Sequence, residues 1–169
     1  MMRPSHRLDV LAVPLGADHA PVEALRQLLA ELREDGVIDV RGGPGPASRR
    51  WMPEGFRGLR LDMPERITLY GNRQGGFRVY CPVENEPITA AFSYAYSEAR
   101  RQARPDLETL NCPVCGGVHA LGELPGRPPF HFARLALQTI DAEALRPAPA
   151  MVERLERIFG GVRWVGVRT

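Results

Sequence analysis

The chain has 169 residues, of which 44% are hydrophobic and 25% charged, and its formal net charge at neutral pH is +2. This apolar content excludes an intrinsically disordered chain, and no apolar run approaches the about 20 residues that a membrane-spanning helix requires. The nearly balanced charge gives no reason by itself to expect nucleic acid, and because no secretory signal is recognised we expect a single cytoplasmic domain.

Residues 7–40 are predicted to form a strand, a helix and a second strand. The apolar pattern over 8–15 favours a strand. Apolar residues then recur at helical spacing, and Gly36 is placed to end the helix in a left-handed conformation. A short second strand is predicted over 37–40. The apolar face of the helix comprises Val22, Leu25, Leu28, Leu29 and Leu32.

Residues 41–60 are predicted to form a loop, because a cluster of glycine and proline breaks regular structure at its start. The loop carries Arg49, Arg50 and Trp51 in succession. An arginine pair beside a tryptophan can grip a protein, a phosphate or a base. Such a tryptophan more commonly packs on the edge of a domain beneath an arginine side chain. The three residues are nevertheless the candidate binding patch of this sequence.

Residues 67–80 are predicted to form a β-hairpin with a glycine-rich turn over 71–76. A helix is predicted over 87–103, and Pro105 closes it. The helix lies between two cysteine-containing turns, so it is an insertion that packs against the rest of the domain. Its shared apolar face comprises Ile88, Ala91, Phe92, Ala95 and Ala99.

The last part of the chain repeats the outline of the first. Alternation over 130–139 predicts a strand, apolar spacing over 148–159 predicts a helix, and 162–167 is the final strand. Because each strand–helix–strand end is too small to bury both faces of its strands, we expect the two ends to share one sheet. The sequence thus predicts one α+β domain over 1–169, with a mixed sheet, strand–helix–strand ends and a central hairpin. A degenerate zinc-ribbon-like insertion over 77–122 carries the helix.

Two cysteine turns indicate a metal site. The sequence CPVCGG at 112–117 is a complete Cys-x-x-Cys turn, whereas CPVENE at 81–86 begins in the same way and has Glu84 in place of the second cysteine. Two such turns that face each other make a four-coordinate zinc site. Three zinc ligands are therefore predicted: Cys81, Cys112 and Cys115.

The sequence leaves the fourth ligand open between His119 and Glu84. Imidazole is the commoner zinc ligand, but Glu84 stands where a ribbon places one. A second interpretation is a hairpin that has lost its metal and is held by packing. A third is a redox-active Cys112–Cys115 pair, which is disfavoured because glycines and a strand follow it instead of a helix.

At 81–84 and 112–117 the chain resembles the zinc-ribbon knuckles, with the pattern Cys-Pro-x-Cys-Gly, that occur in many bacterial proteins. The whole chain faintly resembles small bacterial proteins of unknown function with a central ribbon, some of which lie beside secreted toxins. The resemblance implies structural zinc and a role in binding protein or nucleic acid. Glu84 departs from the knuckle pattern.

No set of nucleophile, base and orienting residue is recognised, so no catalytic residue is assigned. The sequence favours a non-enzymatic protein that binds another macromolecule, in particular a protein such as a toxin, as an immunity protein, inhibitor or adaptor does. A nucleic-acid-binding zinc-ribbon protein is the first alternative, and an enzyme with an unrecognised site is the second. Zinc is the expected cofactor, and no membrane partner is expected.

Overall fold

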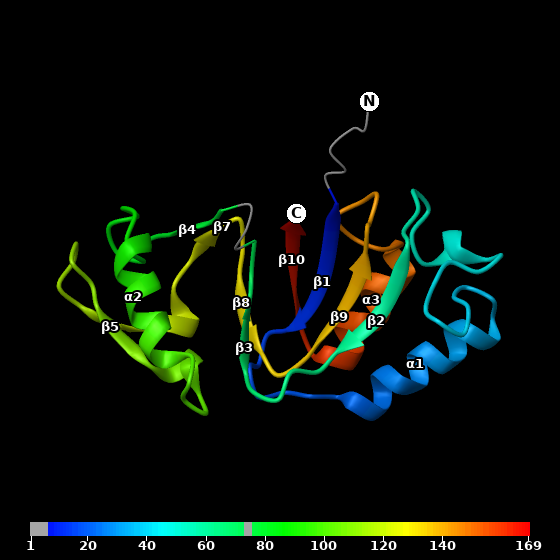
Figure 1. The fold of residues 1–169 in the computed structure, drawn as a ribbon, viewed down its shortest axis with the longest axis horizontal. Coiled ribbons are helices and arrows are strands. Elements are labelled where there is room, and N and C mark those ends of the chain that lie inside the picture. The colour runs from blue at the N-terminus through cyan, green and yellow to red at the C-terminus, as the bar shows by residue number, and fades with distance from the viewer. Residues whose placement is uncertain (1–6, 73–75) are drawn as a thin grey trace.

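The computed structural model of the protein describes residues 7–72 and 76–169. The chain folds into two lobes that lie side by side (Figure 1). The sheet lobe comprises residues 7–66 and 134–169, and the ribbon lobe comprises the described residues between them, within 67–133. Helices and strands occur in both lobes, so the predicted α+β class is confirmed. No described helix combines the length and apolar character that a bilayer span requires.

A four-stranded sheet forms the centre of the sheet lobe. In order across the sheet, its strands are β10 (Val162–Arg168), β1 (Leu8–Pro14), β9 (Ala136–Ile140) and β2 (Gly58–Asp62). β1 pairs along its whole length with β10. The two ends of the chain therefore share one sheet, as the sequence predicts. Its strand pairs are all antiparallel, so the sheet is not mixed.

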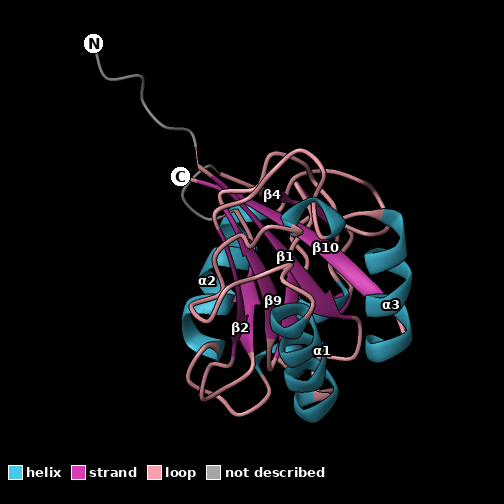
Figure 2. Cartoon of the chain, turned by 90° about the vertical axis from the view of Figure 1, so that its right-hand side faces the viewer, coloured by secondary structure: helices cyan, strands magenta, loops and turns pink. Residues whose placement is uncertain are grey.

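Two helices, α1 (Val22–Glu34) and α3 (Pro149–Phe159), cover one face of this sheet (Figure 1; Figure 2). Each helix buries a stripe of apolar side chains at helical spacing. Gly160 follows α3 with a φ of 70°, a left-handed conformation that ends the helix without a steric cost. The buried stripes are Leu25, Leu28, Leu29 and Leu32 in α1, and Met151, Leu155 and Phe159 in α3.

The opposite face of the sheet packs on the ribbon lobe. The contact is made by β3 (Thr68–Tyr70) and β8 (His131–Ala133), which pair antiparallel. Leu11 of β1 shares a buried cluster with Tyr70, whereas its neighbour Val10 lies in the core beneath the helices. β1 is therefore buried on both faces, which is why its sequence is an almost continuous apolar run.

The ribbon lobe has little regular structure. Its core is a group of aromatic rings whose centroids lie 5.2–6.4 Å apart, from Phe77, Phe92, Tyr96, Phe130 and Phe132. Around them lie short strand pairs and helices. These are β4 (Arg78–Val79) with β7 (Gly126–Arg127), β5 (Thr109–Asn111) with β6 (Val118–Ala120), α2 (Thr89–Ala99), and the 3-10 helices η2 (Pro105–Leu107) and η3 (Leu121–Glu123).

The strand predicted over 37–40 is wrong. Val37 and Ile38 are buried, but their N–H groups donate to the carbonyl of Leu32, so they end α1 and do not join the sheet. Ile38 makes one isolated bridge, to Pro44. The second strand that this part of the chain contributes to the sheet, after β1, is β2, which begins within the segment that the sequence predicts to be a loop.

The hairpin predicted over 67–80 and the single strand predicted over 130–139 are also wrong. β3 and β4 pair with the distant strands β8 and β7, not with each other. Residues 73–75 of the predicted turn lie outside the described residues. The strand predicted over 130–139 is interrupted at Arg134, so that β8 and β9 join different sheets. Strands of two or three residues carry too little local pattern to indicate their partners.

Candidate metal centre

The complete cysteine turn lies at the tip of the β5–β6 ribbon. The Cys112 N–H donates to the carbonyl of Gly117 at 2.8 Å, and the Gly116 N–H donates to the carbonyl of Cys112 at 2.9 Å. Gly116 has a φ of 74°, in the left-handed region that glycine adopts without strain. These bonds fold the six residues 112–117 into a tight knuckle between the two strands.

The incomplete turn has the same backbone although it lacks the second cysteine. The Cys81 N–H donates to the carbonyl of Glu86 at 2.8 Å, and the Asn85 N–H donates to the carbonyl of Cys81 at 2.9 Å. Asn85 occupies the glycine position with a φ of 56°, which asparagine tolerates better than most residues. The Glu84 N–H donates to the Sγ of Cys81 at 3.3 Å. Glu84 thus supplies a backbone donor to the knuckle.

The two knuckles bring three thiols together. The Sγ atoms of Cys81, Cys112 and Cys115 all lie within 4.8 Å of one another, and the first two residues are buried. In a tetrahedral zinc site each thiolate lies about 2.3 Å from the ion, which places two thiolates about 3.8 Å apart. The donor type and the spacing therefore fit a metal ion, and these three predicted ligands can hold one.

The pKa values of Cys112 and Cys115 shift in opposite directions. The pKa of Cys112 is lowered, chiefly because the N–H of Cys115 points at its sulfur. The Gly117 N–H lowers the pKa of Cys115, but burial and the neighbouring thiols outweigh it, so the net shift is upward. One thiolate therefore forms first, and its charge opposes a second. A bound cation removes that opposition, because metal binding replaces the remaining protons.

His119 lies beside the thiol cluster. Its Nε2 is 3.2 Å from the Sγ of Cys115, and its place on β6, opposite Leu110, carries the imidazole back toward the knuckle. A Cβ at Gly117 would lie 3.3 Å from that Nε2 and 3.4 Å from the Cys115 sulfur. Glycine at this position therefore leaves the room in which imidazole and thiol approach each other. His119 itself lies outside the cluster of donors that are all within 4.8 Å of one another.

The side chain of Glu84 has a different position. Glu84 is exposed, and its carboxylate does not belong to the cluster of mutually close donors. Of the five predicted ligands, the structure thus gathers three sulfurs, places His119 next to one of them, and leaves the Glu84 carboxylate aside.

The three residues of the predicted binding patch, Arg49, Arg50 and Trp51, differ in exposure. Trp51 is only 1% exposed, and its indole N–H donates to the Oγ1 of Thr139 at 3.1 Å. The prediction of Trp51 as a binding residue is therefore wrong, and it is a core residue of the sheet lobe. Arg49 and Arg50 lie on the 3-10 helix η1 (Ser48–Arg50) and are exposed.

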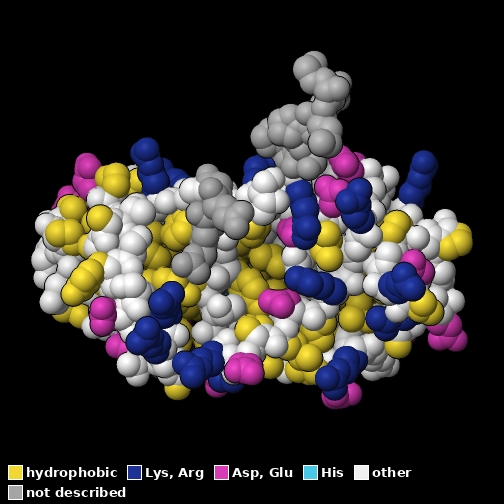
Figure 3. All heavy atoms as spheres, in the orientation of Figure 1, with side chains coloured by type: hydrophobic (Ala, Val, Ile, Leu, Met, Phe, Trp, Pro, Cys, Tyr) yellow, Lys and Arg dark blue, Asp and Glu magenta, His cyan; other side chains and the backbone are white. Residues whose placement is uncertain are grey.

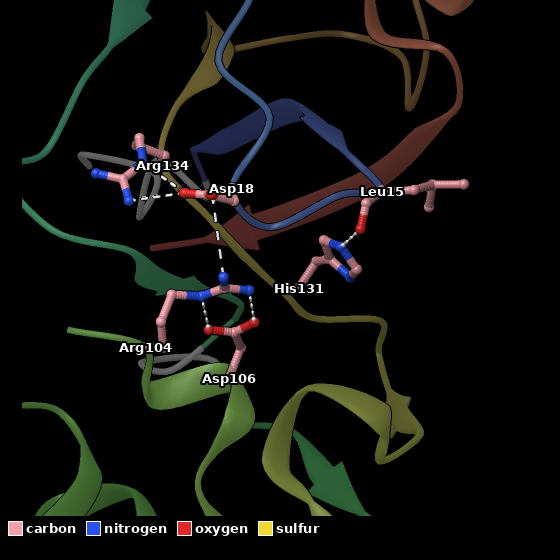
Figure 4. Close-up of polar contacts among 6 residues, drawn as sticks. All are labelled: Leu15, Asp18, Arg104, Asp106, His131 and Arg134. Atoms are coloured by element: carbon pink, nitrogen blue, oxygen red, sulfur yellow. Dashed lines mark hydrogen bonds and ion pairs between the residues drawn. The ribbon is translucent and has the colours of Figure 1, made fainter. Parts of the chain in front are cut away.

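A charged cluster at the boundary of the two lobes is not indicated by the sequence. Arg104 donates to both carboxylate oxygens of Asp106 on η2, at 3.1 and 2.8 Å. Asp18 lies between Arg104, at 4.0 Å, and Arg134, at 2.8 Å (Figure 4). Asp18 and Arg134 are 116 positions apart, so no local pattern could have paired them. The cluster ties η2 to two loops of the sheet lobe.

His131 lies at the same boundary (Figure 4). Its Nε2 is 2.8 Å from the carbonyl oxygen of Leu15, so Nε2 carries the proton and donates it. Burial lowers the pKa of His131, and the charge of Arg163 adds to the lowering, although the Leu15 carbonyl opposes it. The neutral imidazole therefore acts as a hydrogen-bonded bridge between β8 and the loop after β1.

The candidate metal centre is defined by its own geometry. It consists of two knuckles with one backbone conformation, three converging thiols and an imidazole beside one of them. Comparison with protein-family models, with curated proteins and with solved structures finds no match for this chain.

Proposed function

We propose that this chain is a non-enzymatic binding protein, that a structural zinc ion holds its ribbon lobe together, and that its partner is another protein. The observation that carries the proposal is the convergence of three thiols from two separate knuckles. In structural sites the binding energy of the ion contributes directly to folding. The ribbon lobe, whose paired strands have two or three residues each, is where such a contribution matters most.

Zinc suits this donor set because thiolates prefer soft or borderline ions over magnesium or calcium. In the proposal Cys81, Cys112 and Cys115 supply three thiolates, and His119 turns its Nε2 to the ion as the fourth ligand. Three cysteines and one histidine are a common structural set. Four protein ligands leave no open position for water or substrate, so the ion organises the fold and activates no reactant.

Exposed apolar side chains on the ribbon lobe support a protein partner. Val83 and Val114 occupy the same position in the two knuckles, and both are exposed. Figure 3 shows hydrophobic and uncharged atoms over much of the end of the molecule where α2 and β5 lie. Apolar surface of this kind is typical of protein-binding sites. Further exposed apolar side chains of the lobe are Tyr94, Leu107 and Val118.

The surface gives less support to nucleic acid. Trp51, which would stack on a base, is buried. Arg50 and Arg57 each lie 3.7 Å from an aspartate carboxylate. On the face shown in Figure 3, acidic and basic side chains are interspersed and do not separate by sign. Binding to phosphates draws its affinity from many unpaired arginines on one face, so a protein partner is the better proposal.

The titratable groups that meet between the lobes favour a structural role over chemistry. Asp18 and Asp106 each face an arginine, and His131 bonds to a backbone carbonyl. A general base needs a free lone pair directed at a substrate proton. The partners of these groups are consistent with a cluster that joins two lobes.

Metal analysis tests the zinc part of the proposal. The purified protein is expected to hold one zinc ion per chain, and Cys112→Ser is expected to lose it. Zinc well below one equivalent per chain, in protein prepared without chelators, would contradict the proposal and favour a metal-free hairpin.

Site-specific photo-crosslinking tests the protein partner. A photoreactive residue at Val118 of the ribbon lobe, which is 63% exposed, should capture a protein in the native host. The same residue at Val40 of the sheet lobe, which is 87% exposed, is the matched control and should not. The captured protein, once purified, should bind this chain directly. Capture of nucleic acid would favour the first alternative, and turnover of a substrate would contradict a non-enzymatic role.

A further inference from the structure

Strand β5 has one edge that no described strand occupies. Its only strand partner among the described residues is β6. The Glu108 carbonyl and the Cys112 N–H both bond, at 2.8 Å, to residues that flank β6. Alternate residues of an antiparallel strand turn their N–H and C=O groups to opposite sides. Glu108, Leu110 and Cys112 therefore face β6, and Thr109 and Asn111 direct theirs to the open edge.

A groove runs along that open edge, between β5 and α2. Its volume is about 530 Å³, which lies within the about 300–1,000 Å³ of typical binding pockets. Residues of α2, Gln102 and residues 108–111 line it, and none of β6 does, so it lies on the outer side of β5. Ala91 and Ala95 lie four positions apart on α2, and their small side chains leave room on the helix side of the groove. Figure 1 shows α2 and β5 as neighbours in the ribbon lobe.

The groove carries two carboxylates on opposite walls. Glu98 belongs to α2, and Glu108 directly precedes β5. Neither makes an ion pair with any described residue. Two carboxylates without a cation repel each other, and a positive charge placed between them is attracted to both. The groove therefore selects for a basic occupant.

We propose that this groove binds an extended, positively charged segment of a protein partner, which adds to β5 as a third strand of the ribbon. The proposal rests on the protein-binding function proposed above and specifies its site and chemistry. The backbone of the segment pairs with the N–H and C=O groups of Thr109 and Asn111. Apolar side chains of the segment contact the alanine wall, and an arginine or lysine lies between Glu98 and Glu108.

The proposed metal ion would fix the C-terminal end of β5. Cys112 directly follows Asn111, so an ion bound to Cys112 also fixes the last residue of β5. The ribbon then presents its open edge already extended, which lowers the ordering cost of binding.

Peptide selection followed by hydrogen exchange tests the proposal. Short random peptides displayed on phage are selected on the purified, metal-replete protein, and enriched peptides should contain both apolar and basic residues. With a synthetic selected peptide bound, the amides of Thr109 and Asn111 should exchange about tenfold more slowly or better. The amide of Leu110, already bonded to β6, should change little. No enrichment, or slowing that spares Thr109 and Asn111, would overturn the proposal.

Two proline variants separate the edges of the ribbon. Thr109→Pro removes an N–H from the open edge, and Glu108 already has the backbone (φ −62°, ψ 147°) that a following proline requires. It should weaken the selected peptide about tenfold or more. Ala120→Pro removes an outward N–H from the opposite edge, at a residue whose φ of −69° already suits proline, and should bind with nearly wild-type affinity. Equal affinity of the two folded variants would overturn strand addition.

A charge variant keeps the test decisive if Thr109→Pro does not fold. Glu98→Gln together with Glu108→Gln leaves the backbone unchanged and should weaken the basic peptide about tenfold, with a smaller dependence on salt. Unchanged affinity would overturn the proposal. A partner protein captured at Val118 whose binding survives both changes would leave the protein-binding function standing and exclude this groove. Selection of single-stranded nucleic acid from a parallel random library, with no peptide enriched, would overturn both.

Discussion

The two lobes are stabilised by different means. In the sheet lobe, the seven-residue strands β1 and β10 pair along their length, and two amphipathic helices cover one face. In the ribbon lobe the paired strands have two or three residues each, and aromatic rings and three thiols form the interior. An isolated two-stranded ribbon is marginal in water. Backbone pairing therefore holds the sheet lobe, whereas side chains, together with the proposed ion, hold the ribbon lobe.

Replacing Cys112 by serine should give the largest difference in stability between the two lobes. Structural zinc contributes about 10–16 kcal/mol in small zinc-finger peptides, so loss of one ligand should unfold much of the ribbon lobe. Amide protection should fall over 77–122 and persist in β1 and β10, as measured by hydrogen exchange with mass spectrometry. Val114→Ser, in the same knuckle, is the control and should leave the protection unchanged. Equal protection in the two variants would show that the cysteines do not hold the lobe.

Truncating the core of the sheet lobe should have the next largest effect. Leu155 is fully buried beneath the sheet, so Leu155→Ala should lower the free energy of unfolding by about 2–5 kcal/mol. The site is far from the thiols in the sequence and belongs to a separate core cluster, so the loss should be the same with and without a zinc chelator. Denaturant titrations measure it. A loss that depends on the chelator would show that the lobes are not energetically separate.

Adding one methyl group at Gly117 tests whether His119 is a ligand of the proposed metal centre. Its Cβ would lie 3.3 Å from the Nε2 of His119, so Gly117→Ala should weaken zinc binding about tenfold, or about 1.4 kcal/mol. Competition with a chromophoric chelator measures the affinity. In a His119→Ala background the same change should have little effect. An equal effect in both backgrounds would exclude His119 as the ligand that Gly117 accommodates, and Glu84→Ala should leave the affinity unchanged.

The smallest expected effect is a pH dependence at the boundary between the lobes. The folded pKa of His131 is lowered by burial, so its contribution to stability is present above its unfolded pKa of about 6.5. That contribution is lost as the pH falls through the lower folded value. His131→Gln can still donate to the Leu15 carbonyl and cannot be protonated. Below about pH 6.5, the wild type should therefore lose stability more steeply than the variant in denaturant titrations, and parallel curves would contradict this.

Long periodic elements were predictable from the sequence. The leucine stripe of α1 and the apolar face of α3 each extend over about two turns, and apolar residues at this spacing predict a helix. The two cysteine knuckles were each predictable for a related reason, since each is set by residues within six positions. In these cases the local sequence contains the interaction that decides the structure.

Features decided by distant partners were not predictable. The sequence leaves Trp51 open between a binding patch and packing at a domain edge, and its burial involves Thr139, 88 positions away. The pairing of β3 with β8 and the cluster around Asp18 likewise join segments that share no local pattern. The open edge of β5 was not predictable either, because which edge stays open depends on the pairing of the other edge with β6.

The pairing of β1 with both β9 and β10 also sets an order of events during synthesis. β1 and α1 emerge from the ribosome first, but the strands that flank β1 are made only after the whole ribbon lobe. All three cysteines and His119 precede β9. Because domains fold as they emerge, we expect ribosome-bound chains in which residue 133 is followed by a linker long enough to carry it out of the exit tunnel to hold a protease-resistant ribbon lobe and a protease-sensitive β1–α1 segment. The proposed ion could then bind before two of the four strands of the sheet have been made.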